Sequence, residues 1–340
     1  METQRQYQLQ RAGDGAADLT LVAAPVRPPG PNEILVRVRA VSLNRRDVYV
    51  RLGLYPGPKP PTLVPLSDGA GEVIATGPGV SRVAAGDRVA AIFFQRWLDG
   101  RPRPDYMASA LGGAIDGMLS EYVTLHEDGV VKIPAGLSFE EAATLPCAGV
   151  TAWNALVTRG RTQPGDHVLL LGTGGVSMFG LQLAIALGAQ PVVTSSSAAK
   201  LVRARELGAV ATIDTSATPD WPAAVRAVTG GAGVQQALEV GGVGTLPKTL
   251  ASLSFGGHVA LIGGLAGFGG DIPSMALMGT NATASGIYVG SRADFAALLA
   301  FQEKRPIRPV IDRVFAFDEA AAAYQYLDSG GLFGKVVIRL

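Results

Sequence analysis

Residues 167–189, HVLLLGTGGVSMFGLQLAIALGA, constrain the fold of this chain more than any other segment. The apolar run His167–Leu171 has the length and composition of a buried strand, and helical spacing follows from about Val176. Between them, Gly172 permits a tight turn and Gly174 lets the backbone approach a phosphate. The free N–H groups and the positive end of the helix stabilise phosphate charge. This segment therefore predicts a dinucleotide-binding βαβ unit.

One position departs from the GxGxxG fingerprint, because Ser177 stands where the third glycine is expected. The motif alone is weak evidence, and the alternative is an ordinary glycine-rich turn between a strand and a helix. The order of strand, turn, helix and second strand supplies the context that the motif requires. We expect the phosphate-binding loop to consist of Gly172, Thr173, Gly174, Gly175, Val176 and Ser177.

The next strand, Pro191–Ser195, selects the cofactor. An NAD site usually ends this strand with Asp or Glu, whose carboxylate accepts hydrogen bonds from the ribose 2′-OH. This chain instead has three serines there, with Lys200 and Arg203 just beyond. Hydroxyls and a cation favour a 2′-phosphate that a carboxylate would repel, although both cations can also be read as solvated helix charges. The sequence predicts NADP(H), bound through Ser195, Ser196 and Lys200.

The pattern of the chain changes near residue 125. Before it, short β-branched runs such as Ile34–Val41 alternate with Pro/Gly turns, as in a β-barrel or sandwich. After it, short strands alternate with helical segments, which is typical of a parallel sheet and an α/β fold. The tail returns to mixed character and is expected to pack back on the first domain. We expect one domain from residues 1–124 and 293–340 and a second from residues 125–292.

Composition excludes several classes of function. The net charge of +1, from 29 basic and 28 acidic residues, offers no basic face for nucleic acid. The apolar stretches are too short to span a bilayer, and the polar start METQRQYQLQ lacks a signal core, so the cytoplasm is expected. Cys147 is the single cysteine, which excludes an intrachain disulfide and any site that needs two thiolates.

Several segments besides the phosphate-binding loop occur in a family order. They are SLNRRDVYVRLGLYP (42–56), PLSDGAGEVIATGPGV (65–80), DGMLSEYV (116–123), LPCAGVTAW (145–153) and FGKVVI (333–338). The chain resembles the medium-chain dehydrogenase/reductase superfamily, specifically its zinc-free quinone oxidoreductase-like branch. The resemblance implies a GroES-like β-barrel domain and a Rossmann domain, with the active site in the cleft between them. It also implies a homodimer joined edge to edge near Ser285–Val289.

The residues at the zinc-ligand positions of the family indicate whether this chain binds zinc. Zinc-dependent relatives carry a cysteine where this chain has Asn44, and Gly-His-Glu where it has 66–68, Leu-Ser-Asp. Cys147 lies beside the third ligand position, with Ala148 the closer match, and the structural-zinc lobe holds no cysteine. A catalytic zinc takes three protein ligands, which Cys147 and Asp68 alone cannot supply. We expect no metal, and we interpret Cys147 as a small buried hydrophobe.

Without a metal, the substrate must be activated by hydrogen bonds and by its position on the nicotinamide. By resemblance, the Asn44 amide and the hydroxyls of Tyr49 and Tyr55 line the substrate cleft. Tyr49 is the first candidate for the donor to a carbonyl oxygen and Asn44 the second, whereas Tyr55 can equally be a packing residue. For Asp47 and Arg51, a salt bridge that stabilises the loop is the favoured interpretation.

The resemblance also places further residues around the cofactor. Thr151 is expected at the nicotinamide ribose, and Gly263, Gly264 and Tyr288 are expected to border the nicotinamide ring. Phe333 and Lys335 are expected to close over the cofactor, with a plain surface charge as the alternative for Lys335. The aromatic side chains of Phe93, Phe94 and Trp97 form either a substrate-pocket wall or core packing.

These observations predict a zinc-independent, NADPH-dependent reductase that transfers hydride to a quinone or to the activated C=C of an enone or enoyl substrate. One alternative is a zinc-free NADP-dependent alcohol dehydrogenase or carbonyl reductase. The alternative of another class is a non-catalytic NADPH-binding protein with a structural or regulatory role. Donors such as Asn44 and Tyr49 argue against the last, because such a protein has no need of them. The sequence does not identify the substrate.

Overall fold

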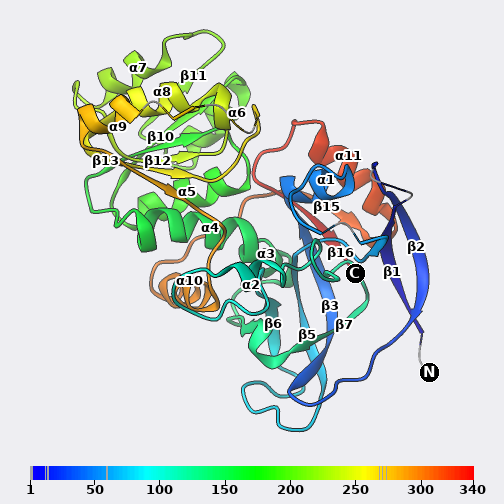
Figure 1. Ribbon diagram of the computed structural model, residues 1–340. Coiled ribbons are helices and arrows are strands. Elements are labelled where there is room, and N and C mark those ends of the chain that lie inside the picture. The colour runs from blue at the N-terminus through cyan, green and yellow to red at the C-terminus, as the bar shows by residue number, and fades with distance from the viewer. Residues whose placement is uncertain are drawn as a thin grey trace. The chain divides into compact units, whose positions relative to one another are not determined.

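The computed structural model describes residues 3–340 except 12, 14, 59, 268, 270 and 273. The chain forms two compact units (Figure 1). The first unit comprises Met1–Val150, Gly290–Lys304 and Ile311–Leu340, and the second comprises Thr151–Val289 and Arg305–Val310. This agrees with the predicted α/β class, in which a GroES-like domain accompanies a Rossmann-like parallel sheet.

The first unit is predominantly β structure. Its strands are β1 (Thr3–Gln10), β2 (Asp18–Pro25), β3 (Glu33–Leu43), β4 (Thr62–Leu63), β5 (Asp68–Thr76), β6 (Arg88–Ala91), β7 (Tyr122–His126), β8 (Val130–Lys132), β15 (Ile311–Ala316) and β16 (Lys335–Arg339). Its helical segments are α1 (Arg45–Arg51), α2 (Pro104–Met107), η1 (Glu127–Gly129), α3 (Phe139–Ala143), η2 (Leu145–Gly149), α10 (Arg292–Lys304), η5 (Phe317–Glu319) and α11 (Ala320–Asp328).

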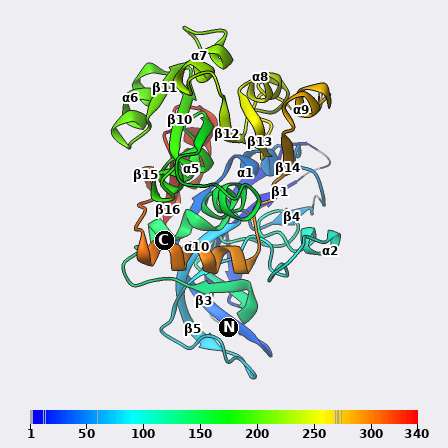
Figure 2. The same cartoon turned by 90° about the vertical axis from the view of Figure 1, so that its left-hand side faces the viewer.

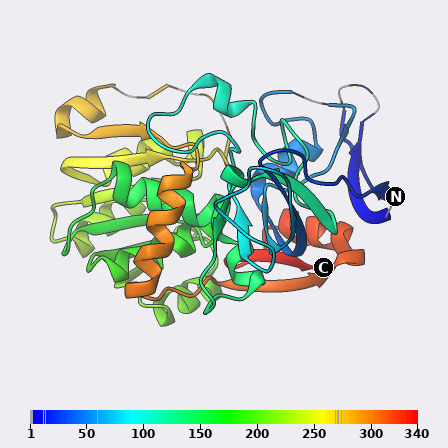
Figure 3. The same cartoon turned by 90° about the horizontal axis from the view of Figure 1, so that it is seen from below.

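A seven-stranded sheet organises this unit in the order β15-β16-β3-β5-β6-β8, with β7 paired to β3. The long strand β3 is central, and its side chains are almost all buried. The tail strand β16 pairs antiparallel with β3, and β15 runs beside β16 in the red tones near the C-terminus in Figure 3. The prediction that the tail packs on the first domain is therefore confirmed, because β16 completes the ladder on one side of β3.

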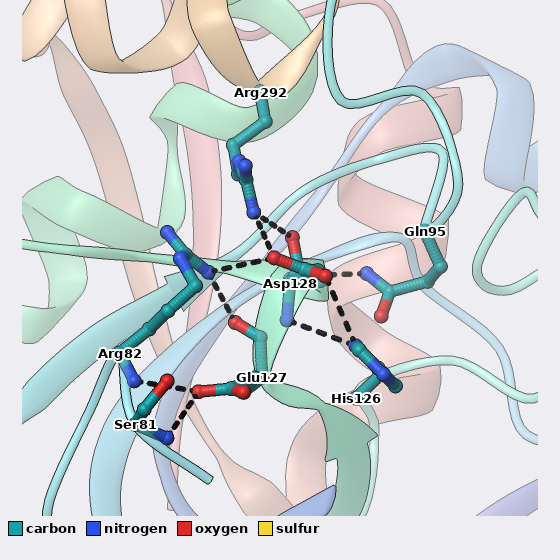
Figure 4. A network of polar contacts seen from close by, with 8 residues as sticks. Ser81, Arg82, Gln95, His126, Glu127, Asp128 and Arg292 are labelled. Carbon is teal, nitrogen blue, oxygen red and sulfur yellow. Dashed lines mark hydrogen bonds and ion pairs between the residues drawn. The ribbon is translucent and has the colours of Figure 1, made fainter. Parts of the chain in front are cut away.

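A polar network ties α10 to the turn η1 within the first unit. Figure 4 shows Asp128 between Arg82, His126 and Arg292, with its carboxylate 2.5 Å from the Arg292 guanidinium. Glu127 accepts hydrogen bonds from the backbone N–H groups of Ser81 at 2.8 Å and Arg82 at 2.6 Å. These donors lower the pKa of Glu127, that of Arg82 most and that of Ser81 next, against the opposing effect of burial. The network is a scaffold, because hydrogen bonds to a charged acceptor fix the turn.

The second unit is built on a parallel sheet with the strand order β11-β10-β9-β12-β13-β14. Its strands are β9 (His167–Leu171), β10 (Gln190–Ser195), β11 (Ala211–Asp214), β12 (Val234–Glu239), β13 (Leu253–Leu261) and β14 (Thr283–Gly286). Its helical segments are η3 (Asn154–Arg159), α5 (Gly175–Ala186), α6 (Ala198–Glu206), α7 (Trp221–Val228), η4 (Gly242–Gly244), α8 (Leu246–Ala251) and α9 (Ser274–Thr280), while α4 (Val150–Trp153) leads into it from the first unit.

Helices cover this parallel sheet on both faces. In the view of Figure 1, α5 lies below the strands and α8 above them, and Figure 2 shows α6 and α7 beside β10 and β11. The inner strands are buried apolar runs, as in the Leu-rich β9. A strand that is covered on two faces needs apolar side chains on both, which is why these runs do not alternate.

The observed division differs from the predicted boundaries at residues 125–150, which belong to the first unit. The reason is pairing: β7 forms its ladder with β3, and β8 forms its ladder with β6. The segment Ser285–Val289, near which the dimer edge is expected, is only partly a strand, since β14 ends at Gly286 and Val289 has a φ of 54°. No helix in the described ranges is long and apolar enough to cross a membrane.

Candidate functional site

The predicted phosphate-binding loop lies between β9 and α5 in the second unit. Gly172 has a φ of 68°, which favours glycine, and its N–H donates to Thr194 O at 2.8 Å. Gly174 is extended and stands directly before the first turn of α5, where free N–H groups lie. A Cβ built on Gly172 or Gly174 would meet no atom within 4 Å. This open space beside a helix N-terminus fits the pyrophosphate of a dinucleotide.

Two side chains of this loop are buried. Thr173 is buried, and Ser177 lies inside the first turn of α5 next to partly exposed Gly175 and Val176. The Ser177 hydroxyl donates to Leu171 O at 2.7 Å. Ser177 therefore stabilises the turn through its side chain. Any contact of this residue with phosphate would come from its backbone.

The serines after β10 lie at the carboxyl end of that strand, next to β9. Ser195 accepts a hydrogen bond from Ser197 N at 3.2 Å, Ser196 is exposed, and Lys200 is half-buried in the first turn of α6. On the neighbouring strand, Asp214 accepts from the Ser216 hydroxyl at 2.6 Å, and this bond is the main cause of its lowered pKa. The Asp214 carboxylate thus stabilises its own turn.

Sequence reasoning missed Glu239, the last residue of β12. Its carboxylate is buried, and one oxygen accepts from Gly241 N at 2.7 Å, Gly242 N at 2.9 Å and the Thr245 hydroxyl at 2.6 Å. The other oxygen accepts from Thr249 at 2.5 Å. The sequence signal that could have revealed Glu239 is a Glu at the end of a predicted strand, followed by glycines and threonines.

The Glu239 turn is joined to the loop that holds Gly263 and Gly264. The N–H groups of Ile262 and Gly263 donate to Glu239 O, and Gly267 N donates to Gly264 O. The sheet thus brings together the carboxyl ends of β12 and β13 as predicted for a Rossmann-like fold. Elsewhere Thr151 is buried in α4, Tyr288 is 46% exposed, and Phe333 is buried.

A buried polar cluster lies in the first unit where β3, β5 and β16 meet. Lys335 is 3% exposed, and its ammonium donates to Leu43 O at 2.6 Å and to Asn44 Oδ1 at 2.5 Å. It also lies 3.8 Å from Asp68 Oδ2. The alternative of a surface charge for Lys335 is therefore wrong. The pairing of β16 with β3 directs this side chain inward, onto the cluster.

Asp68 is the fully buried anion of this cluster. It accepts hydrogen bonds from the Ser67 hydroxyl at 2.7 Å and from Cys147 N at 3.2 Å. Burial raises the pKa of Asp68, although the charge of Lys335 opposes this as the next largest cause. Burial is also the main cause of the raised pKa of the Cys147 thiol, which is half-buried. Cys147 is therefore a poor thiolate.

Helix α1 carries the other predicted candidates. Asp47 accepts from Asn44 N at 2.7 Å and forms its salt bridge with Arg46 at 3.3 Å. The Arg51 side chain instead donates to Ala17 O. Tyr49 is half-buried, with the Arg45 guanidinium 5.8 Å from its ring. The side chain of Arg46, two residues after the N-cap Asn44, is buried in the first unit.

Arg46 is a second residue that the sequence analysis missed. Its buried guanidinium lies 5.0 Å from the centre of the Tyr55 ring and 4.7 Å from the centre of the Phe93 ring. Burial acts to lower the pKa of Arg46, but Asp47 and Tyr55 raise it overall. Phe93, Phe94 and Trp97 are all buried in one aromatic cluster, as in core packing.

The residues at the zinc-ligand positions of zinc-dependent relatives do not fit a catalytic zinc. Asn44 and Ser67 replace two ligands, and Asn44 Oδ1 already accepts from the Lys335 ammonium. Cys147 approaches Asp68 through its backbone N–H. Within the part of the chain that the structure describes, no group of three or more His, Cys, Asp or Glu side chains could hold a metal ion. We therefore derive no step through zinc.

Comparisons with known families match both units. A model described as "Alcohol dehydrogenase GroES-like domain" matches residues 30–135, and one described as "Zinc-binding dehydrogenase" matches residues 175–304. A zinc-type alcohol dehydrogenase-like protein of Schizosaccharomyces pombe is 44% identical over 317 residues, covering 91% of each chain. A quinone oxidoreductase of Pseudomonas aeruginosa is 40% identical over 189 residues, 55% of this chain and 52% of its own.

Solved structures agree with these matches. The crystal structure of an NAD-dependent alcohol dehydrogenase is 34% identical, has a TM-score of 0.88, and covers 99% of both chains. A crotonyl-CoA carboxylase/reductase, at 24% identity and a TM-score of 0.84, shares the fold. The chain therefore belongs to the medium-chain dehydrogenase/reductase superfamily and is an oxidoreductase.

Proposed function

We propose that this oxidoreductase is a zinc-independent, NADPH-dependent reductase that acts on quinones or on the activated C=C of enones and enoyl compounds. One observation carries the proposal: Asn44, whose counterpart in zinc-dependent relatives is a ligand, is held by the Lys335 ammonium. A site with an amide and a tyrosine hydroxyl would offer hydrogen bonds to a substrate oxygen in place of a Lewis acid.

The preference for NADPH is supported by the second unit. Ser195 ends β10 and Ser196 follows it, where an NAD site would have a carboxylate, and Lys200 lies in the first turn of α6. Their hydroxyl and ammonium groups suit a 2′-phosphate. A similar solved structure is named as an NAD-dependent alcohol dehydrogenase, so NAD(H) is the alternative cofactor for this chain.

The proposed chemistry needs little from the protein besides binding and charge stabilisation. Bound NADPH would supply a hydride to the β carbon of an enone or enoyl substrate, or to a ring carbon or an oxygen of a quinone. Reduction of an enone leaves an enolate, and reduction of a quinone leaves a phenolate, so negative charge develops on an oxygen in both cases. The Tyr49 hydroxyl and the Asn44 amide are the donors that we assign to this oxygen. The proton then comes from solvent.

A second candidate function is reduction of carbonyls, or oxidation of alcohols, with the same cofactor. It is favoured by the relatives that are named alcohol dehydrogenase-like, including the 44% identical protein of Schizosaccharomyces pombe. The two functions differ in the bond that is reduced. Oxidation of simple alcohols with NADP⁺ would favour the second.

We also propose that the protein is a homodimer joined through the second unit. Strand β14 is the edge of the parallel sheet, so its outer backbone groups can pair with those of another copy. The adjacent helix α9 exposes Met275 and Met278, at 70% and 72%. Light scattering on the full chain tests this, and the mass of one chain would contradict it.

The function is tested by following NADPH and NADH oxidation after exhaustive chelation, against quinones, enones, enoyl thioesters, aldehydes and ketones. We expect NADPH turnover to persist and to be fastest with quinones or enones. Tyr49→Phe should then lower kcat by about 10²-fold, the usual effect of losing one oxyanion donor. Loss of activity on chelation would overturn the zinc-independent mechanism.

The cofactor assignment has a matched test in Lys200→Ala. Removing one charge-assisted contact should raise KM for NADPH by about 10-fold, or 1.4 kcal/mol, and leave KM for NADH unchanged. Lys304→Ala, on the exposed end of α10, serves as the control for removal of a charge. Equal effects of Lys200→Ala on both cofactors would contradict the assignment of Lys200.

A further inference from the structure

Val289 has a backbone conformation that is unusual for its residue type. Its φ of 54° lies in the left-handed region, which a side chain branched at Cβ rarely adopts. The residue is buried and lies just beyond the carboxyl end of β14, which ends at Gly286. A strained residue persists only where its surroundings hold it, and such residues cluster at functional sites. The contacts that hold Val289 are therefore informative about the function of this segment.

The Asn154 side chain holds the backbone of Val289. Its Nδ2 donates to Val289 O at 2.7 Å across 135 positions of sequence, and both residues are buried. Within the described residues, Asn154 Oδ1 accepts no hydrogen bond, so the bond to Val289 is the one that this buried amide makes. Asn154 begins η3, a π-helical segment, and short segments of this kind are frequent at functional sites. The main contact of this amide is thus with a strained residue.

The segment after β14 is anchored on both sides of an exposed residue. Ile287 N donates to Leu261 O at the end of β13 at 2.9 Å, and the Ile287 side chain is buried. Val289 is held by Asn154, whereas Tyr288 between the two anchors is 46% exposed. Both anchors belong to the second unit. The segment therefore presents Tyr288 and the adjacent backbone groups in one defined conformation.

The strand order indicates which end of the cofactor this segment can serve. The order β11-β10-β9-β12-β13-β14 consists of two halves that meet at β9 and β12. In a sheet of this order, each half binds one mononucleotide at the carboxyl ends of its strands. The first half contains the phosphate-binding loop and Ser195, where the adenosine ribose is expected. The carboxyl end of β14 lies in the other half, which leaves it for the nicotinamide nucleotide.

We propose that Asn154 is a positioning residue for the nicotinamide end of the cofactor. It acts through Val289, which it holds in the left-handed conformation, and so sets the backbone that receives this end. A segment that is already in its bound conformation loses less entropy on binding and therefore binds more tightly. The inference rests on the nicotinamide dinucleotide assigned in the proposed function, and it does not depend on the substrate.

The test separates the two ends of the cofactor by binding alone. Calorimetry on the full-length protein gives the Kd for NADPH and for adenosine 2′,5′-bisphosphate, which lacks the nicotinamide. Asn154→Ala removes the donor that holds Val289, so the Kd for NADPH should rise about 10-fold. The Kd for the bisphosphate should stay within about twofold of the wild type. The fluorescence emission of bound NADPH should also move toward that of the free cofactor.

Val289→Gly provides a rescue that a merely structural role would not show. Glycine adopts the left-handed conformation without strain, so it depends less on the Asn154 bond. Asn154→Ala/Val289→Gly should bind NADPH about threefold more tightly than Asn154→Ala does. Its stability should nevertheless be lower, because a buried valine side chain is lost. Affinity and stability thus change in opposite directions.

Asn281→Gly is the control for loss of an asparagine. Asn281 lies in the exposed turn before β14, at the amino end of the strand, and has a φ of 51°. This variant should leave the affinities for NADPH and for the bisphosphate unchanged. NADH and AMP, measured in parallel, give the same comparison for a protein that prefers NAD(H).

Asn154→Ser keeps a shorter donor and serves if Asn154→Ala does not fold, as judged by circular dichroism; NADPH binding should weaken in the same direction. Equal losses of affinity for NADPH and the bisphosphate in a folded Asn154 variant would overturn the inference, as would a double variant without recovery. A wild type that binds neither dinucleotide would overturn it together with the cofactor assignment. A wild type that binds NADPH but reduces no substrate would contradict the reductase activity alone.

Discussion

At the scale of single residues, the first turn of α1 shows how burial controls ionisation. Asp47 is 1% exposed, and burial raises its pKa to about 6 despite the charge of Arg46 and the N–H of Asn44. The native state therefore binds more protons at this carboxyl than the unfolded chain does between pH 3.8 and about 6. The contribution of Asp47 to the free energy of unfolding falls as pH rises through that window and is constant above it.

Asp47→Asn tests this assignment. The variant keeps an oxygen that can accept from Asn44 N–H but has no titration, so its stability relative to the wild type should rise between pH 4 and 6 and then level off. Urea unfolding of both proteins across that range gives the difference. Parallel stability curves would show that Asp47 does not titrate in the window.

At the scale of elements, Glu239 connects the ends of two strands. Its carboxylate binds the turn Gly241–Thr245 through three donors, and its backbone oxygen binds the loop after β13. Strand β12 supplies the carboxylate, Thr249 lies within α8, and Thr245 directly precedes α8. The Glu239 side chain thus fixes the turn after β12, and its backbone oxygen joins this turn to the loop that contains Gly263 and Gly264.

Glu239→Ala and Glu239→Gln separate the role of this carboxylate from its charge. Alanine leaves several buried donors without partners, so the free energy of unfolding should fall by about 3 kcal/mol. Glutamine keeps the oxygen that serves the turn, and Thr249 can accept from its amide, so the loss should be about 1 kcal/mol or less. Thermal and urea unfolding provide the measurement. Equal losses would show that charge, and not the set of acceptors, stabilises the turn.

At the scale of the whole molecule, the tail is an integral part of the first unit. Strand β16 continues the ladder of β3, and α11 buries Tyr324 in the same core as Val36 and Val41. Residues that are distant in sequence therefore depend on one another for burial. The second unit has its own core around Leu169, Val192 and Val259.

A chain that ends at Val310 tests this dependence. Removing β15, α11 and β16 exposes one side of β3 and empties part of its core, so the first unit should lose its cooperative unfolding. Hydrogen exchange should show loss of protection in β3 and retained protection in β9 and β10. A control chain that lacks only Leu340 should behave like the wild type. Retained protection in β3 would contradict the dependence.

The sequence by itself determined the local features of this protein. The run His167–Leu171 is a strand with the predicted ends, because apolar patterns and glycine turns are local signals. The superfamily, the α/β class and the return of the tail were predicted for the same reason. The division near residue 150 was not, because it depends on which strands pair with β3 and β6.

Only the tertiary structure decided the polar contacts of the site. Lys335 and Asn44 are separated by 291 positions, and nothing local to either residue predicts that they meet. The inward direction of Arg46 and the four donors on Glu239 are also products of packing. Hydrogen bonds between distant side chains depend on the register of whole strands, which a sequence pattern leaves open. The register of β16 on β3 is what turned a terminal lysine into part of the site.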